Sequence, residues 1–439
     1  MPTREDTGQV VPANGHTFAV HDIDYIWQAA HGQTALVQFG NTRPEPDSAF
    51  PFQLLHENLP PDEPDGDDVT YEVTFGQGAD VRRFRLRHLL NASAMSLGGI
   101  NDKLVEAVAQ GQRGLGLVNT GEGGPGIHLG TGADLVLQIG TAKFGLGVPA
   151  PAHGRMFARL DLDRLAELVR THEHVRLVEL KLSQGAKPGV VSLPGSRVSP
   201  LVAKARGVLA GVEAVSPPQH YELLGRTREE KYDKLCAWIH DVRVATGLPV
   251  GIKLCVGRPQ EVVALVERFR RTGCPPDFMT IDSAYGGTSS AHACTANYVG
   301  YGDVYESIGL VDDALRATGL RERVVLCASG ALHTPAYAVA AFAHGADAVF
   351  VARGFLYAAA AANGVAVRQG VSPYSLTDQA RETAEAIDVA RTAQGLRSYS
   401  VQYDQDVRLL TWLLGHRSPR DLDRSCLRRR HDRAVERVA

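Results

Sequence analysis

Eight short apolar runs alternate with longer helical patterns over residues 91–370, and this alternation limits the possible folds most strongly. The runs are ASAMS, LGLVNT, LVLQIG, VRLVELKL, VGIKLCV, DFMTIDS, VVLCASG and DAVFVARG. Helix candidates between them cover residues 100–112, 156–172, 228–246, 259–273 and 334–345. Strands alternating with helices are typical of parallel sheets, and eight in about 270 residues suit a TIM barrel. A doubly wound sheet is the alternative, but no G-x-G-x-x-G follows an early strand. We therefore predict an α/β fold of the (β/α)8 barrel type.

The flanking regions differ from the barrel in composition. Residues 1–90 are rich in proline and acid and predict an irregular N-terminal cap on a barrel domain at 91–370. Residues 371–439 predict a C-terminal helical extension, with helices over 378–396 and 400–416. The last 23 residues carry eight arginines and four acids, which favours an amphipathic helix or a homo-oligomer contact over nucleic-acid binding.

Charge and composition exclude several classes of function. The formal net charge of −3 provides no global basic field for nucleic acid or a membrane surface. No apolar run is long enough to span a membrane, and the N-terminus lacks a signal-peptide core, so we expect a cytoplasmic protein. The six cysteines are scattered without a C-x-x-C pair, which argues against a zinc or iron–sulfur site, and we predict no metal site.

Polar residues follow several of the predicted strands, where the active site of such a barrel lies. The motif NTGEGGPG after the second run contains Asn119 and Glu122, and SQGAKPGVVSLPG after the fourth contains Lys187. Lys253 lies within the fifth run, VGIKLCV. A lysine in so apolar a strand needs an anionic partner, so Lys253 indicates a ligand with negative charge.

The loops after the seventh and eighth runs fit a phosphate group. CASGALHTP contains Gly330 before a helix start, and VARGFLY contains Arg353 and Gly354. Backbone N–H groups and helix N-termini at these two strands form the usual phosphate site of the fold. A phosphate there and a lysine on strand five suit FMN. A phosphorylated sugar is the alternative, but it would require an acid–base carboxylate pair, for which only Glu122 and Asp282 are available.

The chain resembles the FMN-binding synthase domain of glutamate synthase. The family motifs occur in order from about residue 85 to 360 as SAMSLGG, NTGEGG, QIGTAKFGL, ELKLSQGAKPG, LPGSRV, SPPQHYELL, VGIKL and GGTSS, followed by the two phosphate loops. NTGEGG and QGAKPG together are highly specific. The resemblance implies flavin contacts at Ala94, Met95, Ser96, Asn119, Gln138, Lys253, Gly286, Gly287, Gly330, Arg353 and Gly354.

The resemblance also implies a pocket for a 2-oxoacid, with Glu122, Lys187 and Arg206 as its functional residues. The loop GAKPGVVSLPG is one residue shorter than in the family, and Ser192 replaces the glutamine expected to bind substrate. Tyr285 replaces an aspartate and is interpreted as a general acid or as a lid over the flavin. His220 is a further candidate for substrate contact, with a structural role in its loop as the alternative.

Three parts of a complete glutamate synthase are not found in the sequence. Residues 358–375 contain no cysteine for the family's iron–sulfur cluster, and no amidotransferase or second nucleotide-binding domain is evident. We therefore predict an FMN-dependent oxidoreductase acting on an amino acid, imino acid or 2-oxoacid, with a separate electron donor or acceptor. The alternatives are an amine-transferring subunit of an N-methylglutamate-synthase-like complex and a non-catalytic FMN-binding subunit.

Overall fold

Eight parallel strands form a closed barrel in the computed structural model, which describes residues 18–35, 50–59, 69–76, 78, 81–185, 191–287, 294–295, 298–365 and 376–430. The barrel strands are β4 (Leu90–Ala92), β5 (Val118–Asn119), β6 (Leu135–Ile139), β9 (Val175–Lys181), β12 (Val250–Cys255), β13 (Phe278–Asp282), β14 (Val325–Ser329) and β15 (Ala348–Val351). Seven of them lie within the predicted runs, and β4 ends where the first run begins. The predicted (β/α)8 barrel is confirmed.

The barrel strands are apolar along almost their whole length because both of their faces are covered. The exceptions are polar residues such as Gln138, Glu179 and Lys253, which lie within strands and are nonetheless buried. Glu179 on β9 pairs in register with Gln138 on β6 and with Gly251 on β12. These polar residues therefore belong to neighbouring strands of one wall.

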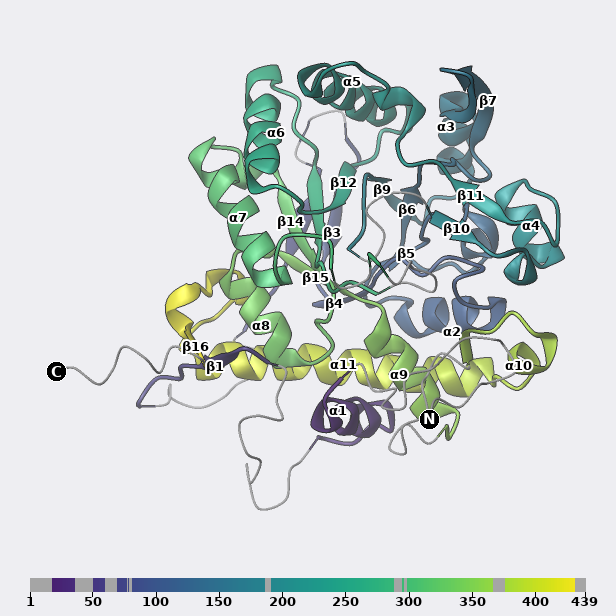
Figure 1. The fold of residues 1–439 in the computed structure, drawn as a ribbon. Helices are drawn as coiled ribbons and strands as arrows, with labels where there is room; N and C mark the ends of the chain where they lie inside the picture. The colour runs from purple at the N-terminus through teal and green to yellow at the C-terminus, as the bar shows by residue number, and fades with distance from the viewer. Residues whose placement is uncertain are drawn as a thin grey trace.

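Helices surround the barrel, although β5 is followed only by a short 3-10 helix at Gly126–Gly130 (Figure 1). The surrounding α-helices are α2 (Asp102–Gln112), α3 (Leu162–Thr171), α4 (Pro200–Arg206), α5 (Arg228–Thr246), α6 (Pro259–Thr272), α7 (Val304–Ala317), α8 (Pro335–Ala343) and α9 (Arg353–Ala362). Within the described ranges, no helix combines the length and apolar character that a membrane span requires.

Besides the pair formed by the terminal regions, three two-stranded sheets lie outside the barrel among the described residues. They are the pairs β2 (Val73–Phe75) with β3 (Phe84–Leu86), β7 (Gly147–Ala152) with β8 (Arg155–Leu160), and β10 (Val191–Leu193) with β11 (Ala214–Ser216). The helix predicted over 156–172 is wrong in its first third, because residues 156–160 belong to β8. His153 and Gly154 join β7 to β8 with positive φ angles of 48° and 70°, as tight hairpin turns require.

The terminal extensions pack together on one side of the barrel (Figure 1). Helix α11 (Val389–Leu413) contacts α2, α8 and α9, and α1 (Val20–Ala30) lies against α9 and α11. The two separate helices predicted over 378–396 and 400–416 are wrong: α10 (Arg381–Glu385) is short, and α11 runs through both segments. Gly395 allows α11 to pack closely against α9, since a Cβ there would lie 2.7 Å from the Cβ of Ala362.

The C-terminal arginine-rich segment forms two short 3-10 helices, Pro419–Asp421 and Arg424–Cys426, followed by a strand, where it is described. Strand β16 (Leu427–Arg429) pairs antiparallel with β1 (Phe52–Leu54), which joins the N-terminal and C-terminal regions. The amphipathic helix predicted for this segment is therefore wrong over residues 417–430, whereas the alternative, a homo-oligomer contact, stays a prediction.

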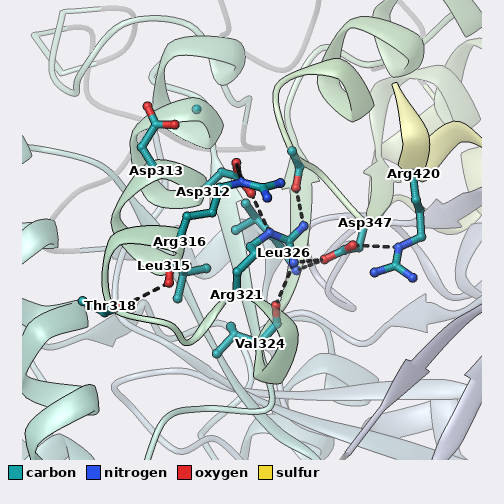
Figure 2. A network of polar contacts seen from close by, with 12 residues as sticks. Asp312, Asp313, Leu315, Arg316, Thr318, Arg321, Val324, Leu326, Asp347 and Arg420 are labelled. Atoms are coloured by element: carbon teal, nitrogen blue, oxygen red, sulfur yellow. Dashed lines mark hydrogen bonds and ion pairs between the residues drawn. The ribbon is translucent and has the colours of Figure 1, made fainter. Parts of the chain in front are cut away.

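Ion pairs close the amino-terminal end of the barrel strands, which we call the lower end. Figure 2 shows Arg321 between the carboxylates of Asp312 and Asp347, with Arg420 on the other side of Asp347. Arg321 lies 2.9 Å from one oxygen of Asp347, and Arg420 lies 2.9 Å from the other. The N–H of Leu326 on β14 also donates to Asp347, so this carboxylate links the start of β15 to its neighbour strand.

Candidate functional site

A cavity of about 110 Å³ lies at the carboxyl-terminal end of the barrel strands, which we call the upper end. A smaller recess of about 50 Å³ adjoins it. Both are lined by Ala94, Gln184, Gly287, Ala352 and Arg353, so we call them the main cavity and the side recess of one site.

Most of the residues that the sequence predicted for the cofactor line this site. The main cavity is lined by Ala94, Met95, Ser96, Gln138, Gly287 and Arg353. The side recess contains Ala94, Lys253, Gly286, Gly287, Gly330, Arg353 and Gly354. Among the predicted catalytic residues, Glu122 lines the main cavity.

The buried carboxylate of Glu179 organises the wall beneath the main cavity. Asn119 and Gln138 donate to its Oε1 over 2.8 and 2.7 Å, and Thr280 donates to its Oε2 over 2.6 Å. Asn119 therefore supports the wall instead of lining the cavity. Because the NH₂ group of Gln138 is held by Glu179, its carbonyl oxygen is left as the acceptor for a ligand.

An ion pair between Lys181 and Glu122 borders the main cavity. Lys181 Nζ lies 2.6 Å from Glu122 Oε1, and the two side chains are only 7% and 12% exposed. The loop that carries Glu122 passes close to Ser96, since a Cβ on Gly121 would lie 2.7 Å from the Ser96 nitrogen. Gly121 also has a φ of +66°, so both the position and the conformation require glycine here.

Sequence reasoning missed Glu179 and Lys181. Both lie in the run VRLVELKL two residues apart, and hence on one face of β9. The argument that singled out Lys253, a charged residue inside an apolar strand, applies equally to these two residues.

The side recess has the features of an anion site. The peptide carbonyls of Ala331, Leu332 and His333 accept hydrogen bonds from His333 Nδ1, the Tyr403 hydroxyl and the Tyr399 hydroxyl, at 2.9, 2.8 and 2.7 Å. In a trans peptide the carbonyl and the following N–H point in opposite directions. The N–H groups of Leu332 and His333 therefore point away from these partners, and neither donates to another part of the described chain.

Backbone conformation supports the same conclusion. Gly330 has a φ of 113°, and Ala331 has a φ of 56°, which is uncommon for a residue with a side chain. Consecutive residues of this kind turn their N–H groups toward a common point and form a nest for anions. Arg353, at the start of α9, adds a positive charge to the lining. These residues fit a phosphate group.

Lys253 and Asp282 also line the side recess. Lys253 is 4% exposed, and Asp282 accepts a hydrogen bond from the N–H of Gly185 over 3.0 Å. A Cβ on Gly286 would lie 2.7 Å from an oxygen of Asp282, so only glycine fits at this position without a shift. Asp282 lines the side recess and Glu122 lines the main cavity, so the two carboxylates border different parts of the site.

Arg206 lies behind Glu122 instead of lining the main cavity. Its Nη2 donates to the carbonyl of Leu97 over 3.2 Å, and its guanidinium carbon lies 4.8 Å from the ring centre of Phe144. Burial lowers the pKa of Arg206, and the nearby Glu122 carboxylate opposes that shift. The structure thus brings Arg206 close to Glu122 without exposing it to the cavity.

His220 is buried behind Lys181. Its Nδ1 lies 2.8 Å from Lys143 Nζ, and its Nε2 donates to the carbonyl of Lys181 over 2.7 Å. Lys143 in turn pairs with Glu222 at 2.9 Å. Burial, together with the Lys143 ammonium, holds the pKa of His220 well below its usual range. These contacts agree with the structural alternative and do not bring His220 to the cavity.

Two further predicted residues, Ser192 and Tyr285, are not among the residues that line the cavity. Ser192 lies on β10 and donates to Glu213. The Tyr285 side chain is half exposed, and its carbonyl accepts a hydrogen bond from Arg353 over 3.3 Å. Lys187 lies outside the described residues.

Comparison with known protein families assigns the chain to one family. The family model described as the conserved region in glutamate synthase matches residues 67–417. The chain belongs to the glutamate synthase family. The resemblance found in the sequence is thereby confirmed, and the prediction of an oxidoreductase of this family agrees with it.

Relatives in this family are moderately similar to the chain. It is 30% identical over 356 residues to the glutamate synthase large subunit-like protein YerD of Bacillus subtilis, covering 80% of the chain and 64% of YerD. It is 29% identical over 271 residues to the archaeal-type glutamate synthase [NADPH] of Thermotoga neapolitana, covering 61% of the chain and 47% of that protein. The chain therefore spans between about half and two thirds of the length of these relatives.

A solved structure supports the fold. A flavocytochrome b2 mutant with pyruvate bound aligns with a TM-score of 0.50 over 95% of this chain and 88% of that one, at 14% sequence identity. This likeness shows the barrel architecture alone.

Proposed function

We propose that this chain is an FMN-dependent oxidoreductase of the glutamate synthase family that acts on an amino acid, an imino acid or a 2-oxoacid. The main support is the main cavity joined to a side recess that is built for an anion and contains Lys253. When bound, FMN supplies hydride transfer between its N5 atom and a carbon next to nitrogen.

The side recess is proposed to hold the phosphate. The N–H groups of Leu332 and His333 and the guanidinium of Arg353 would donate to it, since charge-assisted bonds from arginine are strong with phosphate oxygens. Lys253 would place a buried positive charge beside the flavin, where it stabilises the negative charge that builds up on reduction. Ala94, Met95, Ser96 and Gln138 would line the rest of the cofactor site.

The substrate is proposed to bind above the main cavity, close to Glu122. Lys187 would contact the substrate carboxylate, and Arg206 would act on the same end of the site through its charge beside Glu122. The Lys181–Glu122 pair would hold a carboxylate oxygen at the cavity, where it would orient a substrate ammonium or iminium group. Weaker candidates for substrate contact are Tyr285, Ser192 and His220, because the structure gives them contacts outside the cavity.

Electron transfer is proposed to involve a separate donor or acceptor. The chain covers only part of the relatives that it matches, so the substrates of those longer proteins are not transferred to it. A cytoplasmic location and a homo-oligomer remain predictions from the sequence.

The proposed function can be tested by reducing the purified protein anaerobically and mixing it with a panel of imino and 2-oxo acids. We expect the flavin absorbance to return with at least one acid. Bound FMN that no acid reoxidises would favour the non-catalytic subunit, and amine transfer without net flavin oxidation would favour the N-methylglutamate-synthase-like complex.

A single variant separates cofactor binding from substrate binding. Lys187→Ala should abolish the response to the acid and leave FMN bound, whereas the exposed Lys204→Ala on α4 serves as the matched control. Loss of FMN from Lys187→Ala would mean that Lys187 contacts the cofactor.

A further inference from the structure

The loop Gly330–His333, which forms one wall of the side recess, is anchored from outside the barrel. Tyr399 and Tyr403, which hold the carbonyls of His333 and Leu332, lie on the C-terminal helix α11. Both tyrosines are fully buried. The orientation of two successive peptide groups in the recess wall therefore depends on an element that follows the barrel in sequence.

The N-terminal helix anchors the same loop through a carboxylate. Asp22 on α1 is 3% exposed, and its Oδ2 lies 3.0 Å from His333 Nε2 and 3.2 Å from the Tyr337 hydroxyl. The other ring nitrogen of His333 meets the carbonyl of Ala331. Because Asp22 fixes the orientation of the imidazole, it also fixes the third carbonyl of the loop.

An aromatic residue before α1, Phe18, covers the ring of His333. Phe18 stacks on His333 with ring centres 3.5 Å apart and planes 9° apart. The guanidinium carbon of Arg353 lies 5.1 Å from the Phe18 ring centre. Phe18 is also part of the lining of the side recess, so the N-terminal segment reaches the site itself.

We propose that α1 and α11 preorganise the side recess for a phosphate monoester, with Asp22 and Tyr403 as positioning residues that hold the loop N–H groups toward it. This inference rests on the proposed FMN-dependent function. Without these side chains the loop peptides can rotate, and their N–H groups no longer converge before the ligand arrives. Binding must then order the loop as well, which weakens affinity for the phosphate part of the ligand.

The test compares FMN with riboflavin, which has the same ring and sugar chain but no phosphate. Both affinities are measured on the flavin-free full chain by quenching of flavin fluorescence. Asp22→Asn and Tyr403→Phe should each weaken FMN binding about tenfold, the effect of one buried hydrogen bond, and riboflavin binding by less than about twofold. A merely structural role would change both affinities together.

The matched control is Tyr25→Phe on the same helix. The Tyr25 hydroxyl donates to Asp406 on α11 over 2.7 Å, so this variant removes an α1–α11 contact that does not touch the loop. We expect its FMN affinity to stay within about twofold of wild type. Thermal unfolding shows whether each variant is folded. If Asp22→Asn does not fold, Tyr403→Phe alone tests the inference.

The outcomes separate this inference from the function on which it rests. Wild-type protein that binds neither flavin would overturn both. The inference alone would be overturned if the wild type binds FMN and Asp22→Asn and Tyr403→Phe keep full affinity for it. The same holds if these two variants lose FMN and riboflavin equally, or if their FMN affinity equals that of Tyr25→Phe.

Discussion

The two ends of the barrel use the same kinds of charged residue for different purposes. At the lower end, Asp347 is in contact with two arginines and a backbone N–H, and the network is closed (Figure 2). At the upper end, the Lys181–Glu122 pair borders a cavity, and within the described part of the chain no carboxylate forms an ion pair with Lys253. We infer that the lower charges stabilise the barrel, and we propose that the upper charges serve a ligand.

The largest expected effect is at the lower end. Asp347→Asn removes a buried carboxylate that faces Arg321 and Arg420, and we expect a loss of about 3 kcal/mol in the free energy of unfolding. Denaturant unfolding measures this loss. The FMN affinity of the folded variant should be unchanged, and a matching loss of FMN affinity would show that the two ends are not independent.

Lys253→Gln tests the upper end in the same way. The variant should bind FMN about thirtyfold more weakly, which corresponds to about 2 kcal/mol for a lost charge-assisted contact. Its free energy of unfolding without flavin should not fall, since the lysine has no carboxylate partner among the described residues. A destabilised protein with normal FMN affinity would assign Lys253 to the fold.

The Lys181–Glu122 pair calls for a double-mutant cycle. Glu122→Gln and Lys181→Met should each reduce kcat/KM for the substrate, and their effects should be coupled by about 1.5 kcal/mol because the side chains touch. FMN affinity, measured in parallel, should change little. Additive effects on kcat/KM would contradict a joint role at the cavity.

Acid should weaken the upper end through a buried histidine. His128 lies in the turn Gly126–Gly130, near the backbone of Met95, and burial lowers its pKa to about 4. Protonation then favours the unfolded chain, so the stability from neutral His128 is present above about pH 6.5 and is lost as the pH falls toward 4.

The measurement is the free energy of unfolding at neutral pH and at about pH 5.5, where His128 alone should cost the wild type about 1 kcal/mol. His128→Gln should show a pH dependence that is shallower by this amount. Identical pH profiles for the two proteins would mean that His128 does not titrate between the folded and unfolded states.

The sequence was sufficient for the barrel because buried parallel strands are continuous apolar runs that few other structures produce. It failed at residues 156–160, which were assigned to the following helix but form part of the hairpin strand β8. The long helix α11 was divided in two because its packing against α1, α2, α8 and α9 is not visible locally.

The site was predictable in part for a similar reason. Residues at strand ends, such as Gln138 and Arg353, reach the cavity because the fold places them there. Arg206 and His220 are near in sequence to the motifs of the site, but their position depends on side-chain packing, and both are buried behind the residues that line the cavity. Asp22 lies so far from the barrel in sequence that no local pattern connects it with His333.

The account depends on the binding of FMN at the upper end of the barrel. Titration of the flavin-free wild-type protein with FMN, followed by flavin fluorescence, tests this directly. We expect saturation at one FMN per chain with a Kd of about 1 µM or tighter, and a yellow protein on purification. A colourless protein that leaves FMN fluorescence unquenched would contradict the account.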